Sequence, residues 1–179
     1  MILTLRSMAD ADLPLVAHWL TLPHVSRWWT EPVADEVAGY WRAVRGEEPT
    51  CALVAVVDGA PVGWCQWYRW ADYPEASGYG ARPGDVGIDY AIGKATMVGR
   101  GVGTAMIAQL LEHVRAALPA ASLLVAVDLE NLASRRVLAK NGFVLTELRR
   151  IASEPEELTA LYRSVGESVG ESVGDLGGA

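Results

Sequence analysis

A glycine-rich turn directly before an amphipathic run is the feature that most constrains this chain. Residues 98–104 read Val-Gly-Arg-Gly-Val-Gly-Thr, and apolar side chains then recur at helical spacing as far as Leu118. Three glycines in five residues let the backbone turn tightly and approach a ligand, and the following helix offers N–H groups at its positive end. The segment predicts either an anion-binding loop or an ordinary tight turn, and the spacing alone leaves both open.

Two nucleotide-binding motifs fit this turn poorly. A P-loop requires Lys followed by Ser or Thr after the last glycine, and the residues that follow here are Thr104 and Ala105. The turn also lies in the middle of the chain, after several predicted strands, whereas a dinucleotide-binding turn joins the first strand to the first helix. Neither of these two folds is therefore expected.

The residues around the turn resemble the GNAT superfamily of N-acetyltransferases. The half of the chain that looks like the family's acetyl-CoA-binding half contains Gly-Arg-Gly-Val-Gly-Thr, then a strand over 123–127, then Asn-Leu-Ala-Ser-Arg-Arg-Val-Leu-Ala-Lys-Asn-Gly-Phe over 131–143. The N-terminal half is similar to the aminoglycoside 6′-N-acetyltransferases and to their siderophore-acylating relatives. That second likeness rests on Trp19-Leu20, Pro23-His24-Val25, Trp28-Trp29 and Gly87-Ile88-Asp89. Together the two likenesses span roughly residues 3–163.

This resemblance implies a fold, a co-substrate and a set of binding residues. The fold is the α/β (α+β) GNAT fold, with a mixed central sheet of about seven strands flanked by about four helices. The co-substrate is acetyl-CoA, whose pyrophosphate the backbone amides of the turn hold in that family, and no metal is expected. The residues that the resemblance assigns to cofactor binding are Tyr90, Ala91, Ile92, Val98, Gly99, Arg100, Gly101, Val102, Gly103, Thr104, Asn131 and Ser134.

The composition predicts a single domain that needs no disulfide or bound metal ion to fold. A chain of 179 residues is long enough to bury roughly two thirds of its unfolded surface. No apolar run reaches the ~20 residues of a membrane span and no secretory signal is visible, so we expect no membrane partner and a cytoplasmic location. Cys51 and Cys65 both lie in apolar runs, which favours buried, reduced thiols over a cross-strand disulfide.

The charge of the chain bears on its partners. A net charge of −7 without a basic stripe argues against nucleic acid as a partner, because nothing is placed to displace counterions. The same charge favours a cationic small-molecule amine as substrate, although acidity also keeps an ordinary protein in solution. The sequence leaves a monomer and a homodimer open.

Periodicity and turn residues predict an order of elements: strand, two helices, hairpin, strand, glycine turn, helix, strand, helix, hairpin. Asp58-Gly59 marks the first hairpin, residues 24–30 read as irregular, and residues 70–84 predict a long loop of the kind that often carries function. The expected strands are 2–6, 51–57, 61–68, 86–92, 122–127, 143–150 and 156–163. The expected helices are one from the Asp10 cap to near Pro23, then 32–44, 104–118 and 130–140.

The chain divides into one acetyltransferase domain, residues 1–163, and a low-complexity tail, residues 164–179. The tail repeats Ser-Val-Gly-Glu before it ends in Leu-Gly-Gly-Ala. Glycine at every fourth position and few bulky groups cannot offset the entropy of ordering, so the tail is expected to be flexible. No function is assigned to it.

Asp89 is the candidate catalytic residue. Acetyl transfer needs a neutral amine, and a carboxylate at the end of the strand before the turn can hold an ammonium group and accept its proton. Position alone leaves two plainer alternatives open, that Asp89 faces solvent or that it pairs with Arg82. The resemblance to the Gly-Ile-Asp segment of the aminoglycoside enzymes, where this aspartate contacts the amine and is implicated as base, assigns it both roles.

An aromatic wall against sugar rings is the candidate substrate site. The aromatic residues expected to form it are Trp28, Trp29, Trp67, Trp70 and Tyr73, whereas periodicity places Trp19, Trp41 and Trp64 in the core. Three acids at the pocket mouth, Asp72, Glu75 and Asp85, either add negative charge or form solvated surface. Asp72 loosely matches a second substrate-binding acid of the aminoglycoside enzymes.

One position departs from the pattern of many family members. Where they carry a tyrosine that protonates the CoA thiolate, this chain has Leu138, as the ribosomal-protein N-terminal acetyltransferases also do. Water, the proton of the amine itself, or Tyr90 is left to protonate the thiolate. His18, His24 and His113 lack the spacing of metal ligands, and no Cys or Ser pairs with a His, so direct transfer in a ternary complex is the simplest mechanism.

These observations lead to one main functional hypothesis and two alternatives. The main hypothesis is acetyl transfer from acetyl-CoA to a primary amine, the 6′-amine of aminoglycoside antibiotics, which would confer antibiotic resistance. The first alternative is acylation of a siderophore amine or a protein N-terminus on the same fold. The second is a domain that binds acyl-CoA without catalysis.

Overall fold

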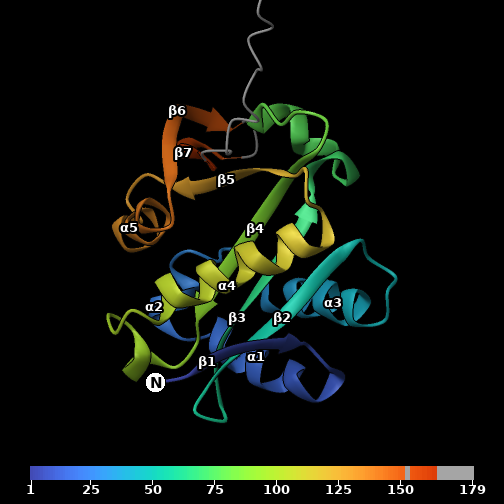
Figure 1. The fold of residues 1–179 in the computed structure, drawn as a ribbon, viewed down its shortest axis with the longest axis vertical. Helices are drawn as coiled ribbons and strands as arrows, with labels where there is room; N and C mark the ends of the chain where they lie inside the picture. The colour runs from blue at the N-terminus through green and yellow to red at the C-terminus, as the bar shows by residue number, and fades with distance from the viewer. Residues whose placement is uncertain (152–153, 165–179) are drawn as a thin grey trace, which may run out of the picture.

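The computed structural model describes residues 1–151 and 154–164, which form one seven-stranded mixed sheet with helices on both faces (Figure 1). The strands lie in the order β1-β2-β3-β4-β5-β7-β6, so the expected mixed sheet is confirmed. The strand bounds are β1 Leu3–Ser7, β2 Thr50–Val57, β3 Ala60–Arg69, β4 Asp85–Ile92, β5 Ser122–Asp128, β6 Phe143–Ile151 and β7 Glu154–Ser164. The α-helices of the described residues are α1 Leu13–Leu20, α2 Pro23–Ser26, α3 Val33–Val44, α4 Val102–Ala117 and α5 Leu132–Lys140.

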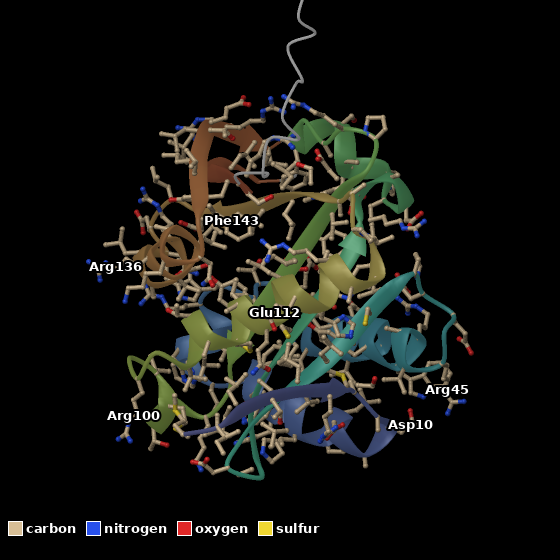
Figure 2. All side chains as sticks on the ribbon, viewed as in Figure 1. Asp10, Arg45, Arg100, Glu112, Arg136 and Phe143 are labelled. Carbon is tan, nitrogen blue, oxygen red and sulfur yellow. The ribbon has the colours of Figure 1, made fainter. Side chains whose placement is uncertain are left out.

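The two faces of the sheet carry different cores because side chains alternate along each strand. On one face, Leu53 and Ile88 pack with Met106 and Leu110 of α4. The opposite face packs against α1, α2 and α3, with the fully buried Trp64 at its centre. The exposed charged residues of the helices include Glu112 on α4 and Arg136 on α5, which Figure 2 labels.

Trp64 anchors a cluster of aromatic rings beneath the substrate half of the molecule. Trp19 of α1 stacks on it at 5.9 Å between ring centroids, and Trp29 lies tilted against it at 5.4 Å. Its indole N–H donates to the buried hydroxyl of Tyr40 on α3 at 2.8 Å. The cluster fixes α1, α3 and the segment after α2 against the same strand, β3.

The strands β4 and β5 are joined over only two residue pairs. They run parallel, and their register covers Asp85 with Ser122 and Val86 with Leu123. Beyond Val86 the two strands separate, so the carboxyl end of β4 pairs only with β3. The chain leaves β4 through the 3₁₀ turn η4, Ala95–Met97, and reaches the glycine turn and α4. The gap between β4 and β5 therefore opens next to the start of α4.

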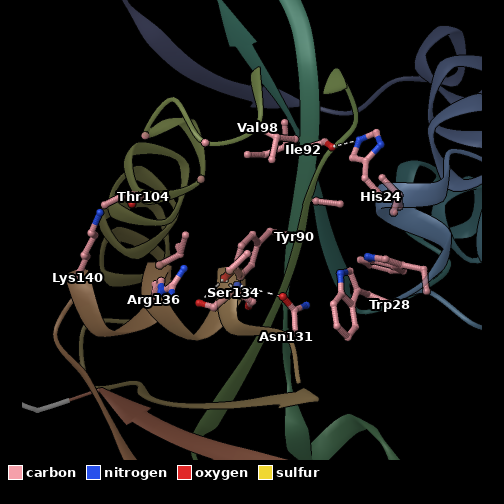
Figure 3. A pocket seen from close by; sticks show the side chains of 18 residues that line it. His24, Trp28, Tyr90, Ile92, Val98, Thr104, Asn131, Ser134, Arg136 and Lys140 are labelled. Carbon is pink, nitrogen blue, oxygen red and sulfur yellow. Dashed lines mark hydrogen bonds between the residues drawn. The ribbon is translucent and has the colours of Figure 1, made fainter. Parts of the chain in front are cut away.

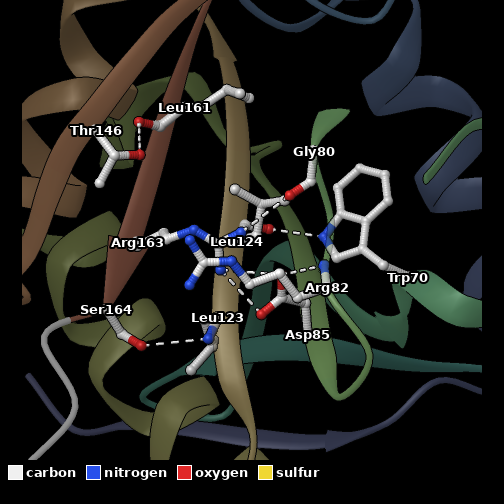
Figure 4. Close-up of polar contacts among 10 residues, drawn as sticks. All are labelled: Trp70, Gly80, Arg82, Asp85, Leu123, Leu124, Thr146, Leu161, Arg163 and Ser164. Atoms are coloured by element: carbon white, nitrogen blue, oxygen red, sulfur yellow. Dashed lines mark hydrogen bonds and ion pairs between the residues drawn. The ribbon is translucent and has the colours of Figure 1, made fainter. Parts of the chain in front are cut away.

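The 70–84 segment, expected as a loop, is pinned at both ends. It contains two 3₁₀ helices, η2 Trp70–Asp72 and η3 Pro74–Tyr79. At its start the buried indole of Trp70 donates to the carbonyl of Leu124 at 2.9 Å, and at its end Arg163 donates to the carbonyl of Gly80 at 3.2 Å (Figure 4). Its middle, between these two anchors, lies over the end of β3.

Asp85 is a structural residue rather than an acid at the pocket mouth. Its carboxylate is 2% exposed, pairs with Arg163 of β7 at 2.9 Å and accepts a hydrogen bond from the backbone N–H of Arg82 at 2.7 Å (Figure 4). Breaking a buried pair of this kind leaves an uncompensated charge, so Asp85 ties β4, the 70–84 loop and β7 together. Both alternatives offered for Asp85 by the sequence, charge at the pocket mouth and solvated surface, are wrong.

Several other local expectations are corrected by the structure. Residues 24–26, expected as irregular, belong to the single helical turn α2, Pro23–Ser26. Trp41, expected in the core, is 41% exposed and carries the Arg45 guanidinium over its ring at 4.3 Å. Ser164, expected to begin the tail, ends β7 and its hydroxyl accepts from the N–H of Leu123 at 3.2 Å. The rest of the tail, residues 165–179, lies outside the described residues.

Both cysteines are free thiols, as expected. Burial raises the pKa of each thiol, and Cys65 is fully buried in the core. No described helix is both long and apolar enough to cross a membrane.

Candidate active site

The glycine turn shapes the backbone that leads into α4. Gly99 and Gly101 adopt left-handed φ angles of 76° and 81°, and Gly101 is the N-cap of the helix. Helix geometry leaves the first N–H groups of α4 without intrahelical acceptors, and the helix dipole adds positive potential at this end. The turn and the helix start therefore form a binding place for an anion.

A cavity of about 340 Å³ lies between this turn, the carboxyl end of β4 and the start of α5 (Figure 3). We call it the turn cavity. Its position follows from the separation of β4 and β5, because α5 begins directly after β5 and reaches across the gap. The expected cofactor residues that line it are Tyr90, Ala91, Ile92, Val98, Gly99, Gly101, Gly103, Thr104, Asn131 and Ser134.

Two expected cofactor residues do not line the turn cavity. Arg100 is exposed and its side chain points away from the molecule (Figure 2). The side chain of Val102 is fully buried in the core against the sheet, so only its backbone can face a ligand. The side-chain pattern of a helix explains this, since Val102 and Met106 share the inward face of α4.

Tyr90 joins β4 to α5 across the gap. Its hydroxyl lies 2.6 Å from the Ser134 hydroxyl and donates to the Ser134 carbonyl at 3.2 Å. Asn131 caps α5, because its side-chain oxygen accepts from the backbone N–H of Ser134 at 3.1 Å. Burial raises the pKa of Tyr90 to about 12, so its phenol stays protonated at neutral pH and can serve as a hydrogen-bond donor.

His24 orients the opposite wall of the turn cavity. Its Nε2 lies 3.0 Å from the carbonyl oxygen of Ile92, which fixes α2 to the end of β4 (Figure 3). This hydrogen bond gives His24 an orienting role in the wall of the cavity.

The turn cavity also has a basic rim that the sequence analysis missed. Arg136 and Lys140 of α5 line it, four residues apart on one face of the helix. Two cations beside the glycine turn strengthen the attraction for phosphate groups. The pattern Arg-x-x-x-Lys was visible in the sequence, but only the placement of α5 across the gap shows that it faces the turn.

Asp89 lies between the turn cavity and the part of the molecule that is expected to bind the substrate. A neighbouring cavity of about 130 Å³, which we call the junction cavity, is lined by Trp28, Trp29, Asp89, Tyr90 and Asp128 among others. The structure thus brings two of the expected aromatic residues and the expected base together beside Ser134. Asp128, at the end of β5, is a further acid in this cavity that the sequence analysis did not single out.

The surroundings of Asp89 suit a proton acceptor. Gln66, its register partner on β3, donates an amide hydrogen bond to its carboxylate at 2.9 Å. Burial raises the pKa of Asp89, and the Gln66 and Tyr68 side chains oppose that shift. Asp89 therefore neither faces open solvent nor pairs with Arg82, the two plainer alternatives. A carboxylate with a raised pKa is a stronger base than an exposed one.

Two more cavities continue from Asp89 toward α3. The loop cavity, about 220 Å³, is lined by Gln66, Tyr68, Trp70, Tyr73, Glu75, Tyr79 and Asp89. The acidic cavity, about 290 Å³, is lined by Glu31, Asp35, Glu36, Gly39, Tyr40, Glu48, Thr50, Gln66 and Tyr73. The structure therefore places Tyr73 and Glu75 at the substrate end of the site and brings in a set of acids that the sequence analysis missed.

Of the expected substrate residues, Trp67 and Asp72 line none of the cavities described above, and Trp70 is mostly buried although it lines part of the loop cavity. Trp67 lies one residue from Gln66, so it projects from the opposite face of β3, where its indole N–H donates to His113 of α4 at 3.2 Å. Trp70 is buried against β5. Asp72 is exposed. The assignment of Trp67 fails because the face of β3 that meets Asp89 depends on register, which the local pattern did not supply, whereas Trp70 and Asp72 lie in the 3₁₀ helix η2.

Leu138 is fully buried in the core and does not face the turn cavity. This agrees with the inference that no general acid acts from this position. Among the described residues, no group of His, Cys, Asp or Glu side chains is placed to hold a metal ion.

Comparison with known proteins places this arrangement in a family. A family model described as "Acetyltransferase (GNAT) domain" matches residues 8–151. Aminoglycoside N(6')-acetyltransferase type 1 of Klebsiella pneumoniae is 31% identical over 119 residues, which cover 61% of this chain and 57% of that protein. Lysine N-acyltransferase MbtK of Mycobacterium sp. (strain MCS) is 27% identical over 164 residues, which cover 89% of this chain and 66% of that protein.

Solved structures give the same picture. The aminoglycoside acetyltransferase AAC(6')-Ib in complex with coenzyme A and kanamycin superposes with a TM-score of 0.78 at 26% identity, covering 90% of this chain and 93% of that chain. The same enzyme in complex with ribostamycin and coenzyme A gives a TM-score of 0.81 at 23% identity, covering 98% and 99%, which supports the fold alone. This chain therefore belongs to the GNAT family of acetyltransferase domains.

Proposed function

We propose that this protein transfers an acetyl group from acetyl-CoA to a primary amine, the 6′-amine of an aminoglycoside. The observation that carries this proposal is the position of Asp89, a half-buried carboxylate between a phosphate-suited cavity and acid-lined cavities. The names of the relatives and of the solved structures support both the acetyl donor and the acceptor class.

The turn cavity fits coenzyme A through its own residues. The amides of the glycine turn and the start of α4 suit the pyrophosphate, and Arg136 and Lys140 add positive charge at the rim. Beyond Val86, the edge of β4 that faces β5 is not paired with it, so backbone groups on that edge are available to an amide-bearing ligand arm. Coenzyme A has such an arm between its pyrophosphate and its thiol.

The chemistry at Asp89 is a direct transfer. The nitrogen of a neutral amine attacks the thioester carbonyl carbon, the new C–N bond forms, and the C–S bond breaks. Asp89 takes up the proton that the amine nitrogen loses, and the thiolate gains a proton from water. Tyr90, protonated and within the junction cavity, can donate a hydrogen bond to developing negative charge.

The acceptor is tested by offering three amines with acetyl-CoA: kanamycin, a hydroxylysine-type amine and a peptide with a free N-terminus. Turnover that is fastest with kanamycin supports the aminoglycoside proposal. Faster turnover with one of the other amines transfers the proposal to a siderophore-type or protein acceptor. Tight binding of acetyl-CoA without turnover on any amine supports the non-catalytic alternative and contradicts the proposed transfer.

Replacing Arg136 by Ala should weaken acetyl-CoA binding by about 3- to 10-fold, because one charge-assisted contact is lost at the rim of the turn cavity. The dissociation constant should also become less sensitive to salt. Titration calorimetry at two salt concentrations measures both effects. Arg115→Ala, an exposed charge change on α4 outside the cavity, is the matched control and should leave the affinity unchanged.

Replacing Glu36 by Gln should stabilise the protein at neutral and alkaline pH. Burial, with the charges of Asp89 and Glu31, raises the pKa of Glu36 to about 7 from 4.5. The stabilising contribution of its proton is complete below about pH 4.5 and is lost as the pH rises through 7. After allowance for the solvent-exposed part of this side chain, Glu36→Gln should add on the order of 1 kcal/mol at about pH 8, which is about 2–4 °C in Tm. Tm values that differ equally at about pH 4 and pH 8 contradict this account.

A further inference from the structure

Tyr73 stands between two of the cavities at the substrate end. It follows η2 in the 70–84 loop, and together with Gln66 it lines both the loop cavity and the acidic cavity. Its ring meets the Tyr68 ring edge-on at 4.9 Å between centroids. Its hydroxyl lies 2.5 Å from the hydroxyl of Thr50 on β2. The Tyr73–Thr50 contact therefore spans from the loop to the sheet and separates the two cavities.

The sizes of the two cavities mean that their separation limits how large a ligand the site can hold. The loop cavity holds about 220 Å³ and the acidic cavity about 290 Å³. Sites for drug-sized ligands begin at roughly 300 Å³, so neither cavity alone reaches that range and the two combined do. A one-ring amine needs only the cavity beside Asp89, whereas a longer acceptor needs both.

The charges on the two sides match an acceptor with well-separated amines. The loop cavity holds Asp89 and Glu75. The acidic cavity is lined by four carboxylates and no basic side chain, and of these four Glu48 is paired with Arg42 at 2.7 Å. Glu31, Asp35 and Glu36 are the other three. A cation held at Asp89 thus has a second site for positive charge beyond Tyr73.

Because the 70–84 loop is attached on both sides of Tyr73, the Tyr73–Thr50 contact is the place where the loop cavity and the acidic cavity can open into each other. The loop is fixed at its start by a buried hydrogen bond from Trp70 to β5, and near its end by an exposed hydrogen bond from Arg163 of β7 to the Gly80 carbonyl. Tyr73 lies between these anchors, and the hydroxyl contact with Thr50 connects it to β2. Loss of that hydroxyl contact leaves the ring held by its edge-on packing against Tyr68, so the ring can shift without unfolding either end of the loop.

We infer that Tyr73, held by Thr50, is a specificity-determining residue that sets the length of the acceptor amine, an inference that rests on the proposed acetyl transfer. With the contact closed, the acceptor is confined to the loop cavity beside Asp89. With the contact open, an acceptor of several rings extends past Tyr73 and places a second ammonium group among the acids of the acidic cavity.

The test compares two acceptors in variants that each remove one hydroxyl, Thr50→Val and Tyr73→Phe. The acceptors are kanamycin, with three rings, and 6-amino-6-deoxyglucose, with one. Each variant should raise the ratio of kcat/KM for kanamycin to that for the one-ring amine by about 5-fold, the effect expected of one net hydrogen bond. Because both changes break the same contact, the double variant should change this kcat/KM ratio by no more than either single variant does. Thr50→Ser keeps a hydroxyl and should match the wild-type ratio.

An unchanged ratio in both single variants, or additive changes in the double variant, overturns the inference. Calorimetric titration of the two amines in the absence of acetyl-CoA gives the same comparison as a ratio of affinities. That second measurement separates the two ideas: a protein that acetylates neither amine contradicts the proposed function, while its binding ratio still decides whether Tyr73 limits the acceptor length.

Discussion

Turnover should fall by roughly 10²-fold or more when Asp89 is replaced by Asn, while the affinity for acetyl-CoA stays near that of the wild type. Asparagine keeps the shape of the side chain and its oxygen can still accept the hydrogen bond from Gln66, so the local structure is retained. What is lost is the basicity of a carboxylate whose pKa burial raises. Steady-state kinetics with kanamycin and calorimetry with acetyl-CoA measure the two quantities separately.

The pattern of the loss distinguishes two roles for Asp89. If it is the base, kcat falls; if it only anchors the cation, KM for the amine rises and kcat is largely kept. Glu112→Gln, an exposed charge change on the outer face of α4, is the matched control and should change neither constant. Full activity of Asp89→Asn on every amine tested removes this residue from the chemistry.

Replacing Gly101 by Val should weaken acetyl-CoA binding by about 10-fold or more. Gly101 has a φ of 81° at the N-cap of α4, and a β-branched residue is strained in that conformation even though nothing lies within 4 Å of an added Cβ. Relief of the strain moves the turn and with it the N–H groups of the helix start. Titration calorimetry measures the loss, and a tenfold change corresponds to about 1.4 kcal/mol.

Gly59 provides a control with the same backbone strain at a remote place. It has a φ of 83° in the hairpin between β2 and β3, and nothing lies within 4 Å of an added Cβ there either. Gly59→Val should lower the Tm to a similar degree as Gly101→Val and leave acetyl-CoA affinity unchanged. An equal loss of affinity in both variants would show that general destabilisation, and not the glycine turn, is responsible.

Local patterns predicted the elements that local physics determines. The glycine turn, the amphipathic run of α4 and the Asp58-Gly59 hairpin are each specified by neighbouring residues, and Asp58 indeed adopts a positive φ of 49°. The lengths of the strands were predicted from the same local patterns, the alternation of apolar residues and the turn residues between them. The mixed sheet followed from the order of these elements and from the family resemblance.

Placement across the sheet could not be predicted in this way. Trp67 and Gln66 are adjacent, yet only the register between β3 and β4 shows that Gln66 shares the face of Asp89. Asp85 is buried because Arg163 reaches it from 78 residues away. Arg136 faces the glycine turn because α5 crosses a gap between strands. Each of these depends on contacts that are distant in the chain.

The short pairing of β4 with β5 affects how the two parts of the sheet can move relative to each other. Among the described residues, the backbone pairing between the half-sheet of β1 to β4 and the half-sheet of β5 to β7 covers two residue pairs, and the rest of the connection is the core under α4 and side chains such as Tyr90 and Asp85. Local opening is easiest where few backbone hydrogen bonds must break, and the short pairing of β4 with β5 is such a place. A ligand seated in the gap contacts both halves at once, so saturation with ligand should reduce the motion of one half relative to the other.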